Sequence, residues 1–169
     1  MKLEWRFPSD FPPETVQKYI VNKEALIYLK NSHPEIIDLK ILSSHRENKK
    51  QFAKLKYHLK GALPNPLHKK AANIPQSFIA DLIIDMQTNI TTMEILPGLF
   101  SNKIHAGGKI YFEEQKDAWI QHVEGDITVN IVGIGKMLER RIEKKFYSTF
   151  ALENEIRNRF LATQVAHIR

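Results

Sequence analysis

A stripe of apolar residues near the C-terminus constrains this chain more than any other feature, because its members recur at helical spacing. They are Ile134, Leu138, Ile142, Phe146, Phe150, Ile156 and Phe160. No glycine or proline follows Gly135. We therefore predict a helix over residues 135 to about 161, within outer limits of 133–165, far longer than an average helix of ~11–12 residues. A helix of this length with one apolar face needs a large apolar surface to lie on.

The composition fits a single domain spanning residues 1–169, long enough to hold a core without disulfides or metals. The absence of cysteine excludes disulfides and thiolate chemistry. No run reaches the ~18 apolar residues of a membrane span, and the first residues do not resemble a signal peptide. We therefore expect a cytoplasmic protein. The net charge of +6 is moderate and agrees with simple solubility.

The N-terminal segment is expected to form one strand and two short helices. Apolar and polar residues alternate over residues 2–7, as in a strand with one buried face. Prolines at positions 12 and 13 followed by Glu14 are typical of a helix start. Apolar residues at helical spacing continue to Leu29, and a break near Val21 and Asn22 divides them into two helices.

Residues 36–44 and 52–59 are the next two expected strands, joined by a polar turn. If the connection has an odd number of residues, the apolar positions of both strands share one face. That face would carry Ile37, Leu39, Ile41, Leu55, Tyr57 and Leu59. Lysines and His58 alternate with the apolar residues of the second strand and are expected to meet water.

Residues 61–82 depart from the strand pattern. Prolines at positions 64, 66 and 75 forbid one long strand, and residues 67–72 and 75–82 could each form a helical turn or two. Long connections of this kind are often functional, so this segment is our candidate for a lid over a pocket. A passive plug over one end of the sheet is the alternative.

The register of the following strands can be derived from a turn centred on Lys116 and Asp117. It pairs Ile104 with Val129, Ala106 with Ile127, Gly108 with Gly125, and Ile110 with Val123, all apolar or glycine. The alternate positions pair Lys109 with Glu124 and Tyr111 with His122 on a solvated face. The preceding strand, turned back across residues 96–98, is expected to place Ile84, Met86, Thr88 and Ile90 on the same inner face.

Gly108 and Gly125 face each other in mid-strand, which suggests that the sheet curls sharply there or that the long helix crosses close by. Contact with a ligand is a further interpretation. Small inner residues at Ser43, Ala53 and Ala106 lie among much larger ones. We therefore expect the space between the sheet and the long helix to be incompletely filled, and a dry apolar hollow can take up an apolar guest.

The order of elements resembles the helix-grip fold of the START-like superfamily (SRPBCC), which includes the birch-pollen-allergen type. Residues 5–29, with a strand, a proline-bearing turn and a helix, resemble the opening of the family, and Gly61-Ala-Leu-Pro resembles the region before the lid helix. Three further stretches resemble the ending of one bacterial branch whose function is uncharacterised. They are Gly108-Lys-Ile-Tyr-Phe, Gly125-Asp-Ile-Thr-Val and Ile134-Gly-Lys-Met-Leu-Glu.

The resemblance implies an α+β fold in which a curved antiparallel sheet of about six or seven strands wraps a long C-terminal helix, with two short helices after the first strand. It also implies a cavity between sheet and helix. Members of the superfamily bind lipids, sterols, quinones or other apolar molecules, and a minority are enzymes or cyclases. No catalytic set is shared by all of them, so no catalytic residue is carried over to this chain.

The expected function is therefore non-catalytic binding or transport of a hydrophobic small molecule or lipid in that cavity. The candidate ligand-binding residues are Trp5, Phe7, Leu39, Ile41, Tyr57, Met86, Thr88, Ile90, Ile110, Phe112, Gln121, Val123, Met137 and Phe146. Of the polar side chains, Tyr57, Thr88 and Gln121 are expected to point inward. Trp5 and Met86 could instead simply fill the core.

Two other functions stay open from the sequence. One is an enzyme of the cyclase or hydrolase kind that uses the same cavity, with Tyr57 or an unassigned acid as proton donor. An inward carboxylate or histidine with a shifted pKa would favour this alternative, and the derived register places none there. The other is an interaction module with a filled core and a basic working surface.

Metal, cofactor and nucleic-acid sites are not expected. The seven histidines are scattered without ligand spacing, and His58, His105 and His122 fall on outward faces. The long helix carries a basic run of Lys136, Arg140, Arg141, Lys144 and Lys145. Glu139 and Glu143 interleave with it at helical spacing, which favours local ion pairs over nucleic-acid binding. A weak contact with anionic membranes, dependent on residues 61–82, is the remaining partner that the charge allows.

Overall fold

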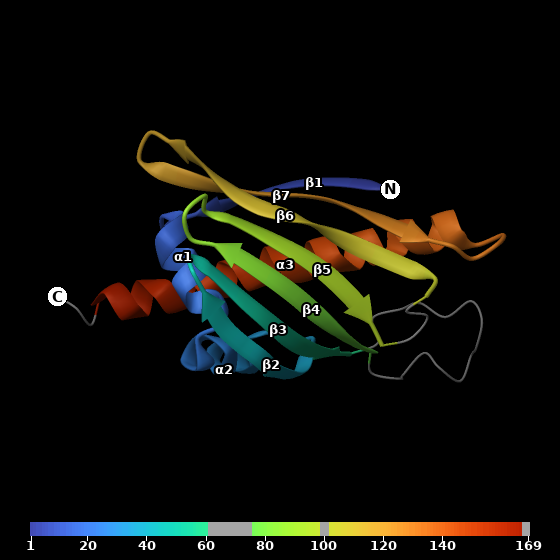
Figure 1. The fold of residues 1–169 in the computed structure, drawn as a ribbon, viewed down its shortest axis with the longest axis horizontal. Coiled ribbons are helices and arrows are strands. Elements are labelled where there is room, and N and C mark those ends of the chain that lie inside the picture. Colours follow the sequence, from blue (N-terminus) through green and yellow to red (C-terminus); the bar gives the residue numbers. More distant parts are fainter. Residues whose placement is uncertain (61–75, 99–101, 167–169) are drawn as a thin grey trace.

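The computed structural model describes residues 1–60, 76–98 and 102–166. Its elements follow in the order β1 (Lys2–Ser9), α1 (Pro13–Ile20), α2 (Lys23–Ser32), β2 (Ile36–Glu47), β3 (Lys50–Leu59), β4 (Gln76–Asp85), β5 (Ile90–Pro97), β6 (Ile104–Gln115), β7 (Ala118–Val129) and α3 (Gly135–Ala166). The strands form one antiparallel seven-stranded sheet in the order β1-β7-β6-β5-β4-β3-β2. The expected fold class, an antiparallel sheet of about six or seven strands with two short helices after the first strand and a long C-terminal helix, is confirmed (Figure 1).

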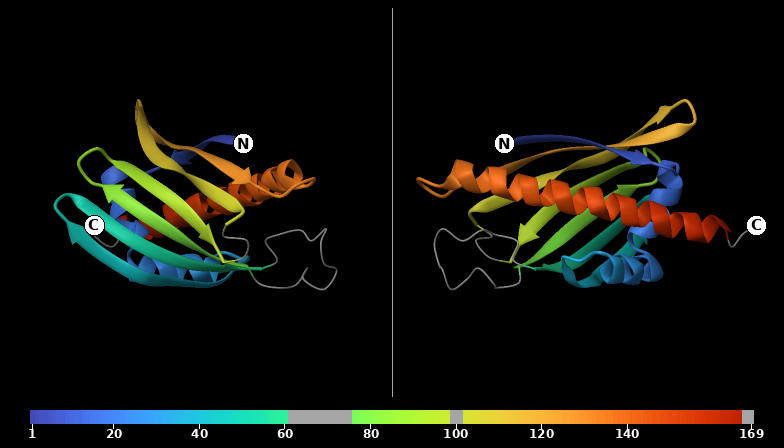
Figure 2. Two further views of the ribbon diagram at one scale, coloured as in Figure 1. Left: turned by 45° about the vertical axis from the view of Figure 1, so that its right-hand side comes forward. Right: turned by 180° about the vertical axis from the view of Figure 1, so that it is seen from behind.

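The curved sheet wraps around α3, which runs along its inner face (Figure 2). The apolar stripe explains this placement, because its members turn toward the sheet. Leu138, Ile142, Ile156 and Phe160 are buried, and Phe146 and Phe150 are partly buried against the same core. The predicted helix is thus confirmed and extends to Ala166. No helix in the described residues is both long and apolar enough to cross a membrane.

The N-terminal elements form as their sequence predicts. Residues alternate strictly between exposed and buried along β1, with Leu3, Trp5 and Phe7 inside. Proline at the first turn begins α1, and the Asn22 side chain caps α2 by accepting the N–H of Ala25 at 3.0 Å. The two helices and the break between them are therefore confirmed. They lie beside α3 at one end of the sheet (Figure 2).

The derived register of β6 and β7 is also confirmed. Gly108 lies opposite Gly125, and the apolar pairs on either side match the prediction. On the outer face Lys109 pairs with Glu124 at 3.1 Å, and the Tyr111 and His122 rings stack with their centroids 4.8 Å apart. His122 points outward as expected but is buried under this stack, because the neighbouring side chains cover it.

The facing glycines mark a close approach of the two strands themselves. A Cβ atom added to Gly108 would lie 2.1 Å from the carbonyl oxygen of Glu124, and one added to Gly125 would lie 2.2 Å from that of Gly107. Both distances are far below van der Waals contact. The close approach of the β6 and β7 backbones therefore accounts for these glycines, because the nearest atoms to each added Cβ belong to the partner strand and not to α3.

The predicted inner face of the fourth and fifth strands is wrong. The chain reverses at residues 86–89, where Asn89 adopts a positive φ of 58° and the Asp85 carboxylate accepts the N–H groups of Gln87 and Thr88. This tight hairpin splits what the sequence pattern suggested was one strand. Ile84 is buried as predicted, but Met86, Thr88 and Ile90 lie at the hairpin end and not on the inner face. Thr91, Met93 and Ile95 point inward instead, opposite Ile110, Gly108 and Ala106.

Two further predictions need correction. Residues 76–82 belong to strand β4 and not to a helical turn, because they pair in register with β3 from Gln76 onward. The remainder of the proposed lid, residues 61–75, lies outside the described residues. In β2, the register with β3 shifts between Ile36 and Asp38 and again between Ile41 and Ser43. Each shift interrupts the regular alternation of side chains between the two faces of the sheet, so Ile37 and Ser43 point outward.

The pairing of Leu39 with Tyr57 and of Ile41 with Leu55 is confirmed. The β2 and β3 strands therefore share an inner face, although Ile36 takes the inner position that the regular pattern gave to Ile37. On the opposite face Lys54 and Lys56 are exposed, as expected.

Candidate ligand-binding cavity

A cavity lies between α3, the two short helices and the inner face of the sheet. Its walls are mostly apolar. Leu55 and Tyr57 line it from β3, Ala80 and Leu82 from β4, and Met93 and Ile95 from β5. Strands β6 and β7 contribute Ile110, Phe112 and Gln121, and α3 contributes residues from Phe146 to Phe160. The expected hollow between sheet and helix is thus present.

The space open to the centres of water-sized molecules is about 80 Å³. That is roughly five to eight times the ~10–15 Å³ that one water molecule needs. The cavity is not fully enclosed and opens to the protein surface. A small apolar guest fits such a space, and a larger one would require lining side chains such as Phe146 to change rotamer.

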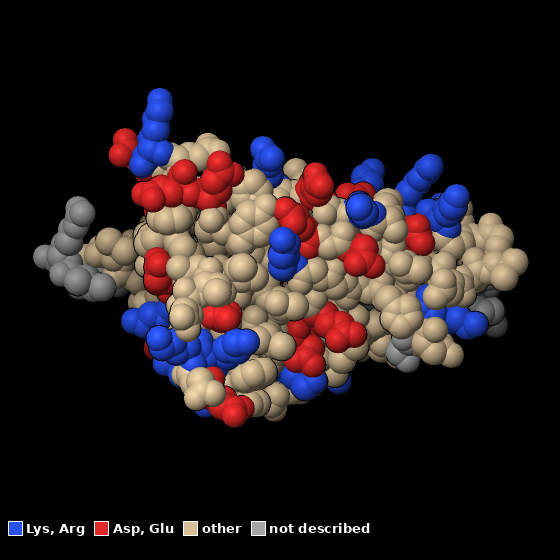
Figure 3. All heavy atoms as spheres, turned by 45° about the horizontal axis from the view of Figure 1, so that its top comes forward, with Lys and Arg blue, Asp and Glu red and all other residues tan. Residues whose placement is uncertain are grey.

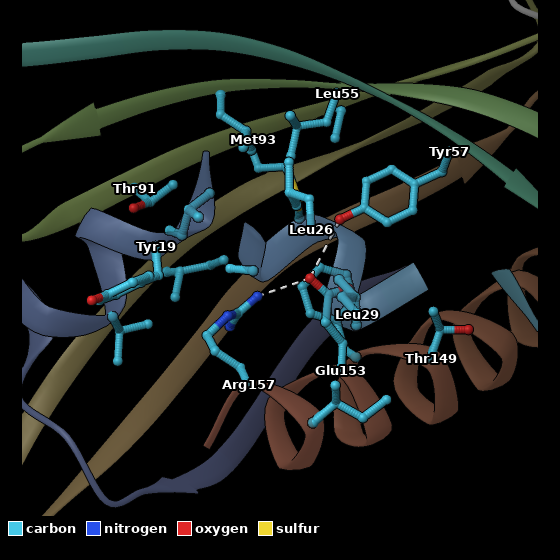
Figure 4. Close-up of a pocket in the computed structure, with 18 of the residues that line it drawn as sticks. Tyr19, Leu26, Leu29, Leu55, Tyr57, Thr91, Met93, Thr149, Glu153 and Arg157 are labelled. Carbon is cyan, nitrogen blue, oxygen red and sulfur yellow. Dashed lines mark hydrogen bonds and ion pairs between the residues drawn. The ribbon is translucent and has the colours of Figure 1, made fainter. Parts of the chain in front are cut away.

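Three polar side chains meet at this cavity: Tyr57 from β3, and Glu153 and Arg157 one turn apart on α3 (Figure 4). The Tyr57 hydroxyl donates to Oε1 of Glu153 at 3.3 Å, and Nη2 of Arg157 donates to the same oxygen at 2.8 Å. The Tyr57 ring stacks on Phe78 with centroids 4.9 Å apart, which fixes its position. We call these three residues the polar cluster.

Burial raises the pKa of Tyr57 well above its ordinary value, and the nearby Glu153 carboxylate raises it further. Tyr57 is therefore a neutral hydrogen-bond donor at any physiological pH. The Arg157 guanidinium balances the negative charge of Glu153, so the polar cluster carries no net charge. The arrangement can orient one polar group of an otherwise apolar guest.

The inward carboxylate of Glu153 corrects the expectation that no acid points into the cavity. Glu153 is 8% exposed. The register argument covered only strands, and this residue lies on the helix. A signal was present in the sequence, because the apolar stripe has a gap between Phe150 and Ile156, and Glu153 occupies the helical position that fills it.

Other buried polar groups surround the polar cluster. Gln121 was expected to point inward, and it lines the cavity with 2% exposure. Thr91 and Thr149 also line it and were missed. The Thr149 hydroxyl is buried without a hydrogen-bond partner among the described residues. These groups could accept or donate further hydrogen bonds to a guest.

The structure brings together only part of the predicted set of ligand-binding residues. Those that line the main cavity are Tyr57, Ile110, Phe112, Gln121 and Phe146. Trp5 and Val123 line a second hollow of about 20 Å³, together with Phe146 and the two facing glycines. A ligand contact for any of these residues remains a prediction.

The other members of that set lie elsewhere. Phe7 and Leu39 are buried in the core, and Ile41 packs partly against it. Met86, Thr88 and Ile90 lie at the β4–β5 hairpin, because the chain reverses between these two strands. Met137 is 38% exposed on α3, because it falls on the helix face opposite the apolar stripe.

His33, at the end of α2, is buried close behind the cavity wall. Its Nδ1 atom accepts the N–H of Glu35 at 3.2 Å. Burial lowers the pKa of His33, and the nearby Thr149 backbone opposes that shift, although the Nε2 atom has no hydrogen-bond partner among the described residues. Within the described parts of the chain, no group of three or more His, Asp or Glu side chains could hold a metal ion.

Neither a family model nor a curated protein sequence matches the chain. Solved structures do match over almost its full length. Ara h 8.0201 aligns with a TM-score of 0.66 and 12% identity, covering 96% of this chain and 98% of that one. The Zhui aromatase/cyclase from Streptomyces sp. R1128 aligns with a TM-score of 0.65 and 10% identity, covering 98% and 95%.

A START superfamily protein from Mycobacterium smegmatis aligns with a TM-score of 0.59 and 14% identity, covering 92% of this chain and 96% of that one. Identities this low establish the fold and nothing finer. The chain has the α+β helix-grip fold of the START-like superfamily, and the resemblance read from its sequence is confirmed at that level.

Proposed function

We propose that this protein binds a hydrophobic small molecule or lipid in the cavity between the sheet and α3, without catalysis. The observation that carries the proposal is the cavity itself: about 80 Å³ of space with apolar walls and one polar cluster. Binding sites for small molecules combine apolar walls with a few convergent polar groups in this way. The START-like fold supports the proposal, since members of that superfamily bind apolar molecules.

The polar cluster suggests what kind of hydrophobic molecule fits. Arg157 already neutralises Glu153, so an anionic headgroup would have to break that ion pair. Breaking a buried pair leaves one uncompensated charge and is costly. An uncharged guest with one hydroxyl or carbonyl group could use Tyr57, Gln121 or the free Thr149 hydroxyl instead. The charge therefore favours a neutral sterol-like or quinone-like molecule over a fatty-acid anion, although a guest as large as a sterol would also require lining side chains to move.

The test is titration with a fluorescent sterol and a fluorescent fatty acid, using the wild type and Ala80→Leu. Ala80 is buried and lines the cavity, so the larger side chain should occupy the guest's space. We expect saturable sterol binding by the wild type and at least a tenfold loss in Ala80→Leu. The matched control is Ala53→Leu on the neighbouring strand, because Ala53 lines neither hollow.

If the wild type binds neither probe, the proposal fails. If Ala53→Leu and Ala80→Leu lose binding equally, the guest does not occupy this cavity. Preferential binding of the fatty acid would keep the cavity as the site and overturn the preference for an uncharged guest.

An enzyme in the same cavity is the second candidate, and Glu153 is the observation that favours it. A buried carboxylate beside a neutral tyrosine can transfer or hold a proton on a bound substrate. Conversion of a bound neutral guest by the wild type, lost in Glu153→Gln but with guest affinity retained, would support catalysis. Unchanged guest after prolonged incubation with the wild type would support binding alone.

A further inference from the structure

The first turns of α3 separate their charges in a way that the sequence did not predict. Glu139 turns inward, where it accepts the N–H of Val129 at 3.0 Å and lies 3.8 Å from the N-terminal amine. Glu143 accepts the indole N–H of Trp5 at 3.3 Å. The expected local ion pairs between these acids and the basic run are therefore wrong. The backbone N–H of Val129 and the indole N–H of Trp5 hold these two carboxylates on the inner side.

Four bases of the same turns are left exposed. They are Lys136, Arg140, Arg141 and Lys144, which we call the basic face. None of them takes part in an ion pair within the described residues. At 3.6 residues per turn they fall within an arc of about 140°, and both acids lie outside that arc. The fifth base of the run, Lys145, points elsewhere and pairs with Glu35.

Apolar side chains accompany the basic face. Val132, in the loop between β7 and α3, is fully exposed at 101%. Met137 is 38% exposed and falls within the same helical arc as the bases. The N–H of Asn130 donates to the carbonyl of Lys103 at 2.7 Å, so the exposed Lys103 lies beside this loop.

The outer face of the sheet differs sharply from the basic face. There acidic and basic side chains are intermixed (Figure 3). Lys54 pairs with Asp81, and Lys109 pairs with Glu124. Charges that are compensated locally exert little attraction on a distant partner. The basic face is thus a distinct surface of uncompensated charge and does not merely reflect the positive net charge of the protein.

We propose that the basic face and the Val132 loop form a docking surface for an anionic lipid bilayer. Several uncompensated bases attract an anionic membrane, and exposed apolar residues beside them can enter the region between headgroups and acyl chains. A nucleic acid would use the bases but offers no apolar layer for Val132 and Met137. This surface does not include the cavity, so the result of a membrane-binding experiment does not decide whether the proposed function is correct.

The experiment is co-sedimentation of the full chain with vesicles of phosphatidylcholine alone or of phosphatidylcholine mixed with phosphatidylserine. We expect binding to the mixed vesicles only, weakening steeply with added salt. Each base near such a surface contributes roughly fivefold in affinity, so Arg140→Glu with Arg141→Glu should cost at least about twentyfold. Val132→Asp should also weaken binding, although it leaves the basic face intact.

The control is Lys23→Glu with Lys56→Glu, which changes net charge equally at exposed lysines of α2 and β3, outside the basic face. It should keep most of the binding. An equal loss in both double variants would show general charge attraction and overturn the docking surface. Absence of binding to mixed vesicles would overturn it as well, and so would duplex DNA or RNA binding that depends on Arg140 and Arg141 while vesicle binding does not. Melting curves identify any variant that fails to fold.

Discussion

The space beneath the sheet is divided unequally. The closed side lies at β1 and the middle of β6 and β7, and the hollow side is lined by β3, β4 and β5 together with Ile110, Phe112 and Gln121 of β6 and β7. On the closed side only about 20 Å³ stays open, whereas the hollow side has about 80 Å³. Small inner residues occur on both sides, at Ala106, Gly108 and Gly125 on the closed side and at Ala80 on the hollow side. Small residues alone therefore do not make the cavity.

A group of tightly packed aromatic residues fills the closed side. Trp5 of β1 packs against Phe7, Tyr147 and Phe150 with centroids 5.6–6.4 Å apart, and these rings fill the space that the glycines leave. On the hollow side aromatic residues such as Phe78, Phe112 and Phe160 also line the wall, and the polar cluster keeps Tyr57 and Arg157 anchored to Glu153. A ring held by a hydrogen bond and a stacking partner cannot collapse into the cavity. Anchoring of the wall side chains, as much as their size, therefore keeps the cavity open.

Gly108→Val should produce the largest effect, because it attacks the closed side where the strands approach most closely. The new side chain would meet the backbone of β7, which cannot give way as a flexible side chain can. We expect a loss at the upper end of the ~1–3 kcal/mol typical of overpacking, or a Tm decrease of roughly 6–12 °C.

Gly107→Val is the control for that change. Its added Cβ would lie 3.1 Å from the Met93 carbonyl oxygen, a tight contact that a small shift can relieve. Thermal melting of both variants decides the matter. Equal Tm losses would show that the close approach at Gly108 is not as described.

The pair Ala53→Leu and Ala80→Leu tests the boundary between filled core and hollow. Ala53 is 1% exposed and lines neither cavity, so extra methylenes there should overpack the core and cost ~1–3 kcal/mol. Ala80 faces open space, and the same change should cost much less. Unfolding in urea measures both. A larger loss for Ala80→Leu would mean that the cavity is filled in solution.

The elements and the β6–β7 register could be predicted from the sequence because their signals are redundant. Long alternating strands on both sides of a two-residue turn centre allow only one pairing in which the inner residues, apart from Gln121, are apolar or glycine. The β4–β5 hairpin gave no such signal. Its turn contains no glycine or proline, and the positive φ falls on Asn89, which tolerates it. Alternation continues through the turn and therefore conceals it.

The site was less predictable than the fold, since it combines side chains from separate elements. Tyr57 and Gln121 were found from strand alternation. Glu153 was missed because an acid within an apolar stripe is expected to be a solvated residue. Its burial depends on Arg157 one turn later and on Tyr57 across the cavity, which no local pattern reveals. The bulges in β2 were hidden for the same reason, because strand irregularities depend on tertiary packing.

Tyr57→Phe should have a moderate effect that separates the two sides of the sheet. It removes a buried hydrogen bond to Glu153 and should cost ~0.5–1.5 kcal/mol and weaken guest binding. Tyr111→Phe removes the corresponding tyrosine–glutamate bond, to Glu124, on the outer face. That bond is solvated and should matter little for stability and not at all for the guest. Probe titration and melting of both variants measure this difference.

Unfolding at alkaline pH provides a second test of the buried state of Tyr57. The pKa of Tyr57 is raised in the folded protein, so its contribution to stability is fully present below the ordinary tyrosine value of about 10. Stability should fall as the pH rises above that value, because the unfolded chain then loses a proton that the folded protein keeps. Tyr57→Phe should reduce this fall. An unchanged alkaline slope in the variant would contradict the buried, neutral state of Tyr57.

The smallest expected effect concerns His33, behind the hollow side. Burial lowers its pKa in the folded protein, although the Thr149 backbone and the Glu153 charge oppose the shift. Its stabilising contribution is therefore present above the ordinary histidine value of about 6.5 and is lost as the pH falls below it. Lys145 adds to the lowering of the pKa, and the pairing of Lys145 with Glu35 fixes that charge nearby.

We expect the Tm of the wild type to fall slightly more between pH 7 and pH 5 than that of His33→Gln. A His33→Gln slope equal to that of the wild type would mean that this histidine is protonated as readily in the folded protein as in the unfolded chain, and that the wall behind the cavity is open to water.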